Sequence, residues 1–112
     1  MISDQFTISV ASGGTTSTAF QIGLGFRYVG LLFPAMDDGD IGLAISLDSG
    51  ANYSPVLDPT DGNDLVICGS GDDPGYMDIS DYVRSVPQEA FLRITCAAQS
   101  SGAVDITVCF KG

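Results

Sequence analysis

Alternation of apolar and polar residues is the feature that most limits how this chain can fold. Phe6, Ile8 and Val10 alternate with polar residues, and the same period of two returns along the sequence. This period matches β-strands, in which successive side chains point to opposite faces, whereas helical periodicity is nearly absent. The expected strands cover residues 6–10, 18–22, 28–33, 41–47, 52–57, 65–68, 76–79, 90–96 and 104–110. About eight short strands between Gly, Asp and Pro turns predict an all-β fold, a jelly-roll-like antiparallel β-sandwich.

Two of these segments alternate so strictly that their faces can be assigned. We expect one row of side chains from each segment to point into the core: Ile41, Leu43, Ile45 and Leu47, and Val104, Ile106, Val108 and Phe110. Gly42, Ala44 and Ser46 should then point outward. The continuous apolar run over residues 28–33 predicts a strand that is covered on both faces or meets a partner on its outer face. Residues 80–84 are expected to form one helical turn capped by Ser80.

The length and composition indicate one folded domain over residues 1–112. A chain of 112 residues has room for one modest core. Hydrophobic residues make up 45% and charged residues 16%, the opposite of a disordered chain. No apolar run approaches the ~20 residues that cross a bilayer. The chain opens without a basic segment, so we expect no secretory signal.

The charge balance limits the partners. Fourteen acidic residues face four basic ones, Arg27, Arg84, Arg93 and Lys111, for a net charge of −10. Binding to nucleic acid or to anionic membranes depends on Lys and Arg, so we expect neither partner. Thirteen of the acids are Asp, which favours turns, and a loop-rich β protein collects Asp without any function.

The chain lacks the residues that most enzymes and zinc sites need. It has no His, which excludes Ser-His and Cys-His catalysis and the common zinc sites. We therefore assign no catalytic, cofactor-binding or metal-ligating residue and expect a protein that is not an enzyme. The three cysteines, Cys68, Cys96 and Cys109, show no C-x-x-C spacing. Cys96 falls on the apolar face of its expected strand, and Cys109 should be partly exposed. A disulfide between Cys96 and Cys109 stays open, with reduced thiols expected.

Residues 46–53 follow the pattern S-x-D-x-G-x-x-aromatic, which resembles the Asp-box hairpin of sialidases. In that hairpin Asp48 would bond turn amides, Gly50 would take a φ that other residues avoid, and Tyr53 would pack beneath. A sialidase propeller needs several copies of the motif, and this chain has one. The motif therefore predicts a stable turn and no catalysis.

Three acidic loops contain oxygens of the kind that Ca²⁺ prefers: residues 37–40, 58–64 and 72–73. None has the EF-hand pattern, because no Glu closes any of them, and we favour solvated turn acids over a calcium site. A pair of carboxylates for glycoside cleavage is a further possibility. The absence of Trp argues against it, since few aromatic rings are left to hold a sugar.

Several segments in order resemble a group of small tailed-phage proteins typically encoded beside the capsid genes. These segments are residues 17–23 (STAFQIG), 28–35 (YVGLLFPA), 45–53 (ISLDSGANY), 91–94 (FLRI) and 106–108 (ITV). The chain departs from the group in having Tyr53 where Trp is usual and Asp-rich turns in place of Ala/Thr-rich ones. These departures leave the position in the virion open.

The resemblance implies a non-enzymatic virion component, a decoration (cement) protein on the outer face of the major capsid protein, assembled in the host cytoplasm. The few charges and the small outward residues suit close packing against protein. Homo-oligomers are expected, trimers before dimers, because capsid lattices offer three-fold positions. Arg27, Arg84 and Arg93 are the expected charged contacts, although pairing of each with an Asp is equally open. The alternative is a tail- or fibre-associated module that recognises host-surface glycan.

Overall fold

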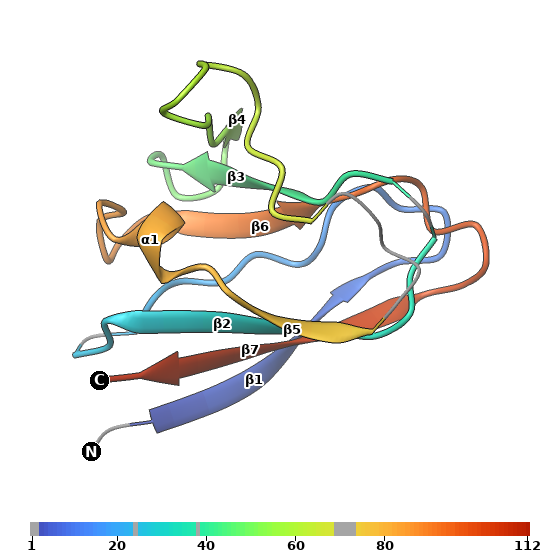
Figure 1. Ribbon diagram of the computed structural model, residues 1–112, viewed down its shortest axis with the longest axis horizontal. Coiled ribbons are helices and arrows are strands. Elements are labelled where there is room, and N and C mark those ends of the chain that lie inside the picture. The colour runs from blue at the N-terminus through green and yellow to red at the C-terminus, as the bar shows by residue number, and fades with distance from the viewer. Residues whose placement is uncertain (1–2, 24, 38, 69–73) are drawn as a thin grey trace.

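The computed structural model describes residues 3–23, 25–37, 39–68 and 74–112 (Figure 1). In this part of the chain the elements are β1 (Ser3–Val10), β2 (Tyr28–Phe33), β3 (Gly42–Ser46), β4 (Ser54–Pro55), β5 (Gly75–Asp78), α1 (Ser80–Val83), β6 (Phe91–Thr95) and β7 (Val104–Lys111). β4 is short because Pro55 has no N–H to donate to a sheet. The predicted all-β class is confirmed.

Two antiparallel sheets face each other across the core. The first sheet has the strand order β1-β7-β2-β5 and the second the order β4-β3-β6. The registers place apolar residues opposite one another, with Ile8 beside Ile106 in the first sheet and Leu43 beside Ile94 in the second. Figure 1 shows the first sheet below and the second above, with α1 at one end between them.

Residues 16–20 extend the second sheet along the outer side of β6. The Phe20 amide donates to the Leu92 carbonyl and the Leu92 amide donates to the Phe20 carbonyl, both at 2.8 Å. Thr16 forms a β-bridge with Thr95, and this pairing is antiparallel like that of Phe20 with Leu92. When this segment is included, the chain changes sheets at every connection except the β3–β4 hairpin. This connectivity is that of a jelly roll, as the sequence predicts.

The buried side chains of both sheets form a hydrophobic cluster between them. The inward row on β7 is confirmed, since Ile106, Val108 and Phe110 are buried and Val104 packs against the cluster. On the other side of the sandwich, Leu43 is buried and Ile45 is partly buried against the same cluster.

The predicted row on β3 is wrong at its end. β3 ends at Ser46, so Leu47 begins the turn and is 71% exposed. The predicted outward residues Ala44 and Ser46 are instead buried. The following turn folds back over the outer face of β3, where the Ser46 hydroxyl accepts a hydrogen bond from the Gly50 amide at 2.9 Å. Both faces of β3 are therefore covered.

The helical turn forms as α1, but Ser80 does not cap it. Ile79 occupies the N-cap position and makes no capping bond through its side chain. The Ser80 hydroxyl accepts a hydrogen bond from the Val29 amide at 2.9 Å and donates one to Asp78 at 2.6 Å. The helix begins one residue earlier than its sequence suggests, so Ser80 is its first residue and not its cap. The Ser80 hydroxyl instead ties α1 to β2.

No helix in the described part of the chain is long and apolar enough to cross a membrane.

Candidate protein-binding face

The outer face of the first sheet carries exposed aromatic and apolar side chains. Along β2, Val29, Leu31 and Phe33 point into the core and are buried, whereas Tyr28 is 52% and Leu32 46% exposed. Tyr76 on β5 lies opposite Leu32 in the register and is 61% exposed. Of the two possibilities for the apolar run 28–33, the structure shows a strand whose outer face is exposed at Tyr28 and Leu32. We call Tyr28, Leu32 and Tyr76 the tyrosine face.

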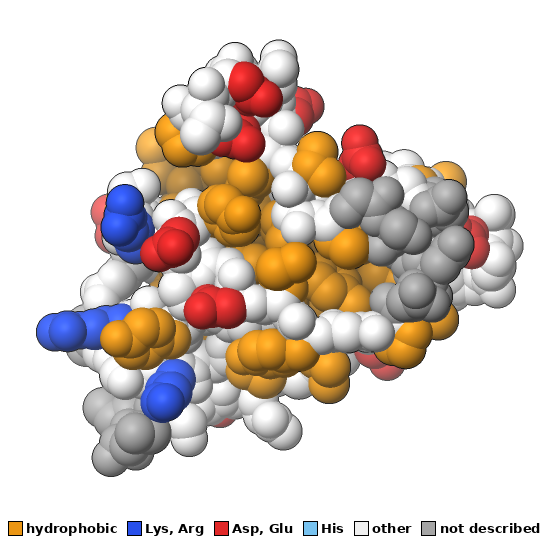
Figure 2. All heavy atoms as spheres, viewed as in Figure 1, with side chains coloured by type: hydrophobic (Ala, Val, Ile, Leu, Met, Phe, Trp, Pro, Cys, Tyr) orange, Lys and Arg blue, Asp and Glu red, His pale blue; other side chains and the backbone are white. Residues whose placement is uncertain are grey.

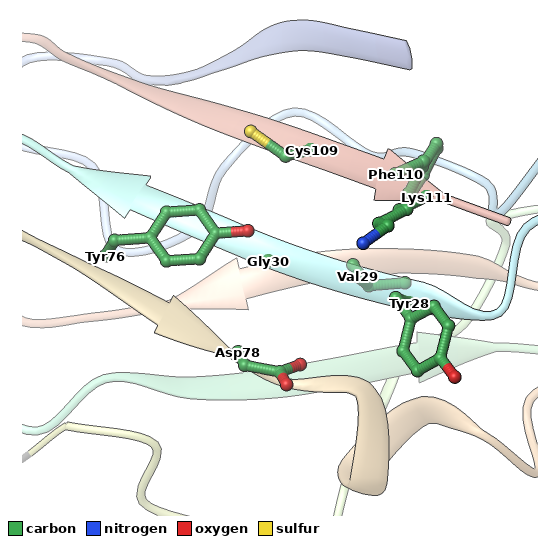
Figure 3. Close-up of a pocket in the computed structure, with 8 residues that line it drawn as sticks. All are labelled: Tyr28, Val29, Gly30, Tyr76, Asp78, Cys109, Phe110 and Lys111. Carbon is green, nitrogen blue, oxygen red and sulfur yellow. The ribbon is translucent and has the colours of Figure 1, made fainter. Parts of the chain in front are cut away.

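A hollow lies on this face, lined by Tyr28, Gly30 and Tyr76. Figure 3 shows the Tyr76 ring lying across β2, with its hydroxyl directed toward Gly30. A Cβ placed on Gly30 would overlap that phenol group. The hollow has a volume of about 240 Å³, and Asp78, Cys109 and Lys111 also line it. Its size suits one or two side chains of a partner better than a drug-sized ligand, which needs roughly 300 Å³ or more.

The groups around the hollow offer binding rather than proton transfer. Burial, with smaller contributions from Cys109 and Asp78, raises the pKa of the Tyr76 phenol above its usual value. Hydrogen bonds from Ser80 lower the pKa of Asp78. The phenol therefore stays neutral and can donate a hydrogen bond, while Asp78 stays ionised and accepts. Within the described residues, no group of three or more His, Cys, Asp or Glu side chains is arranged to hold a metal ion.

The hairpin at residues 46–53 has the turn role that its motif predicts. Asp48 accepts hydrogen bonds from the Ser46 hydroxyl at 2.7 Å and from the Asn52 amide at 2.9 Å. Gly50 has a φ of +86°, in the left-handed region that favours glycine. The Tyr53 ring lies under the Arg93 guanidinium, 3.8 Å from the ring centroid to Cζ. Asp48 is thus held by donors of the hairpin itself, and Tyr53 is held by Arg93 of β6.

Aspartates of the acidic loops accept hydrogen bonds from backbone amides, Asp58 and Asp61 within their own turn and Asp37 from the loop between β6 and β7. Asp37 accepts from the Ser101 amide at 3.0 Å and Asp58 from the Thr60 amide at 2.9 Å. Asp61 accepts from the Asn63 amide at 2.9 Å. Asp38, Asp72 and Asp73, which belong to the predicted calcium loops, lie outside the described residues.

The cysteines lie at the margin of the core or on the sheet surface. Cys96 packs partly buried against the core cluster, and this burial raises the pKa of its thiol. Cys109 lines the hollow beside Tyr76. Both are free thiols, so the disulfide that the sequence left open is not formed.

The tyrosine face was not singled out from the sequence. The apolar run 28–33 gave a signal for β2, but Tyr76 lies far away in the chain and meets Leu32 only through the pairing of β2 with β5. Gly30 in the middle of the run was the remaining hint, because a glycine inside a strand often marks a close approach of another group.

No protein-family model matches the chain, and no curated protein is similar to it in sequence. Among solved structures, the chain is similar to the SPBc2 prophage-derived protein YomS. The TM-score is 0.56 at 14% sequence identity, and the match covers 98% of this chain and 95% of that one. The likeness shows that the two chains share a fold over nearly their whole lengths.

Proposed function

We propose that this protein is a non-enzymatic structural component of a tailed-phage virion, a decoration protein that binds the outer face of the major capsid protein and stabilises the head. The observation that carries the proposal is the tyrosine face, an exposed aromatic surface on a rigid two-sheet block. Tyr is among the residues that dominate binding energy at protein interfaces. The likeness to a prophage-derived protein supports a phage setting.

The charge of the molecule fits the outside of a shell. A protein with a net charge of −10 is repelled by packaged DNA and therefore suits the outer surface. Assembly would take place in the host cytoplasm. Many small subunits on a symmetric lattice can act together through weak contacts. Trimers are proposed before dimers, and sedimentation velocity tests this, since a constant mass of 11.6 kDa at all concentrations would contradict self-association.

The proposal is tested by mixing the purified protein with undecorated phage heads and measuring co-sedimentation. Tyr76→Ser should weaken binding by roughly tenfold or more, because an exposed aromatic anchor is lost. Tyr82→Ser is the matched control, since Tyr82 is an exposed tyrosine on α1, outside the tyrosine face. Wild-type protein that stays in the supernatant, or equal effects of the two substitutions, would contradict the assignment.

A glycan-binding module is a second candidate, and the same hollow favours it. Tyr28 and Tyr76 line the hollow together with the Asp78 carboxylate, which gives aromatic surface beside a hydrogen-bond acceptor. Jelly rolls occur in lectins as well as in viral shells. A glycan array distinguishes the two candidates. Glycan binding that Asp78→Asn abolishes, without any binding to heads, would favour this function over decoration.

A further inference from the structure

Three of the four basic residues gather at one end of the sandwich. Tyr28 pairs with Lys111 in the β2–β7 register, and the Arg27 amide donates to the Lys111 carbonyl at 3.0 Å. Arg27 and Arg84 line one hollow. Figure 2 shows blue side chains gathered on the left of the molecule, the end at which Figure 1 places both chain termini. We call Arg27, Arg84 and Lys111 the basic end.

These three side chains have no acidic partner among the described residues, although acids outnumber bases by 14 to four in the sequence. Within the described residues, none of them has a nitrogen within 4.0 Å of a carboxylate oxygen, and none makes a side-chain hydrogen bond. Acidic residues do lie in the neighbouring segments. Asp81 lines a second hollow together with Arg84, and Glu89 follows Gln88, which lines the hollow shared by Arg27 and Arg84. Arg93, in contrast, is engaged with Tyr53. The three bases are therefore available to a partner.

The surface between the two arginines is partly apolar. The hollow that they share has a volume of about 390 Å³, and Ile22, Phe26, Val83 and Val86 are among its lining residues. Tyr28, which belongs to the tyrosine face, directly follows Arg27 in the chain and lies beside Lys111. The tyrosine face is thus bordered by cations at one end. A partner that covers both must present apolar side chains next to negative charge.

We propose that the basic end binds a carboxylate-rich segment of the partner protein, which under the proposed function is an acidic patch on the capsid shell beside the apolar contact. Guanidinium groups match carboxylates in a bidentate geometry, and three unpaired cations in a strongly acidic protein are complementary to such a segment. Nucleic acid is disfavoured, because three cations neutralise too few phosphates for the charge-driven binding on which nucleic-acid affinity depends.

Salt and substitution test this contact on undecorated heads. The variant Arg27→Gln/Arg84→Gln/Lys111→Gln should bind on the order of tenfold more weakly at low salt, because each exposed pair contributes a factor of about five or less. The difference from wild type should shrink as salt rises. The control is Ala11→Glu/Ala98→Glu/Ala103→Glu, which makes the net charge more negative than −10 by the same three units. These three alanines are exposed and lie just outside β1, β6 and β7, at the strand ends away from the basic end. Equal loss in both variants would overturn the inference.

A second measurement does not depend on heads. Amide and arginine side-chain NMR signals of the protein are followed during titration with a short oligo-glutamate peptide and, separately, with a short DNA duplex. Shifts confined to the basic end with the peptide, lost in the Gln variant, support the inference. An absence of shifts with the peptide, or stronger binding of the duplex, overturns it.

The two measurements separate this inference from the proposed function. Binding to heads that is independent of salt and of the three bases would leave the decoration role standing and remove the acidic contact. Peptide binding at the basic end without any binding to heads would leave the contact standing and remove the decoration role.

Discussion

Asp48 shows how a single side chain fixes the hairpin between β3 and β4. Besides the bonds from Ser46 and the Asn52 amide, its second oxygen accepts one from the Asn52 side chain at 2.9 Å. The Ser46 bond, followed by the two Asn52 bonds, lowers the pKa of Asp48 from 3.8 to about 2. The carboxylate is therefore held by donors supplied within eight residues of chain, which is why the motif could be interpreted from the sequence.

Asp48 should make the stability of the protein depend on acidity. A carboxyl group whose pKa is lower in the folded state stabilises the fold above its unfolded pKa near 3.8, and this contribution is lost as the pH falls toward 2. We expect Asp48→Ala to lower the thermal midpoint at pH 7 and to flatten the fall of that midpoint between about pH 4 and pH 2. Calorimetry across this range measures both. An unchanged pH profile in the variant would show that the Asp48 bonds do not stabilise the fold.

At the scale of elements, β3 shows where alternation stops being informative. A period of two assigns faces only while the chain remains a strand, and β3 ends before Leu47. Alternation also assumes that one face is open to solvent, whereas Ala44 and Ser46 on the outer face are buried and the returning turn bonds to Ser46. The row on β7 was predicted correctly because β7 continues for eight residues to Lys111.

Two leucines in the same predicted row should respond very differently to truncation. Leu43 is 2% exposed, so Leu43→Ala should lower the free energy of unfolding by about 2–5 kcal/mol through the cavity it leaves. Leu47→Ala should change it by less than about 0.5 kcal/mol, because the side chain lies in solvent. Urea denaturation measures both variants. Comparable losses would mean that β3 continues through Leu47 into the core.

At the scale of the whole molecule, the fold was easier to predict than its working surface. Most strand positions and the turns between them follow from local periodicity and from Gly, Asp and Pro. The tyrosine face and the basic end depend on strand order, which joins Tyr76 to β2 and brings Lys111 beside Tyr28. Such neighbours are set by long-range pairing, and no local pattern encodes them.

The shared core predicts that the two sheets unfold together as one domain. Ile106 on β7 and Leu43 on β3 belong to the same hydrophobic cluster. Ile106→Ala should therefore cost about 2–5 kcal/mol, as Leu43→Ala does, and each should shift one common transition. Far-UV circular dichroism and tyrosine fluorescence are the probes. Separate midpoints for the two probes would contradict a single cooperative unit.

The neighbouring ends of the chain make this protein a good subject for circular permutation. Ser3 and Lys111 lie opposite each other in the β1–β7 register, so a short linker can join the two ends without disturbing a strand. New termini opened in the exposed loop at residues 59–62 would emerge beside β4, on the side of the sandwich away from the first sheet (Figure 1). A cargo fused there would be displayed outward while the tyrosine face and the basic end stay uncovered. In the natural order, a fusion to either end emerges beside the very surface that is proposed to bind.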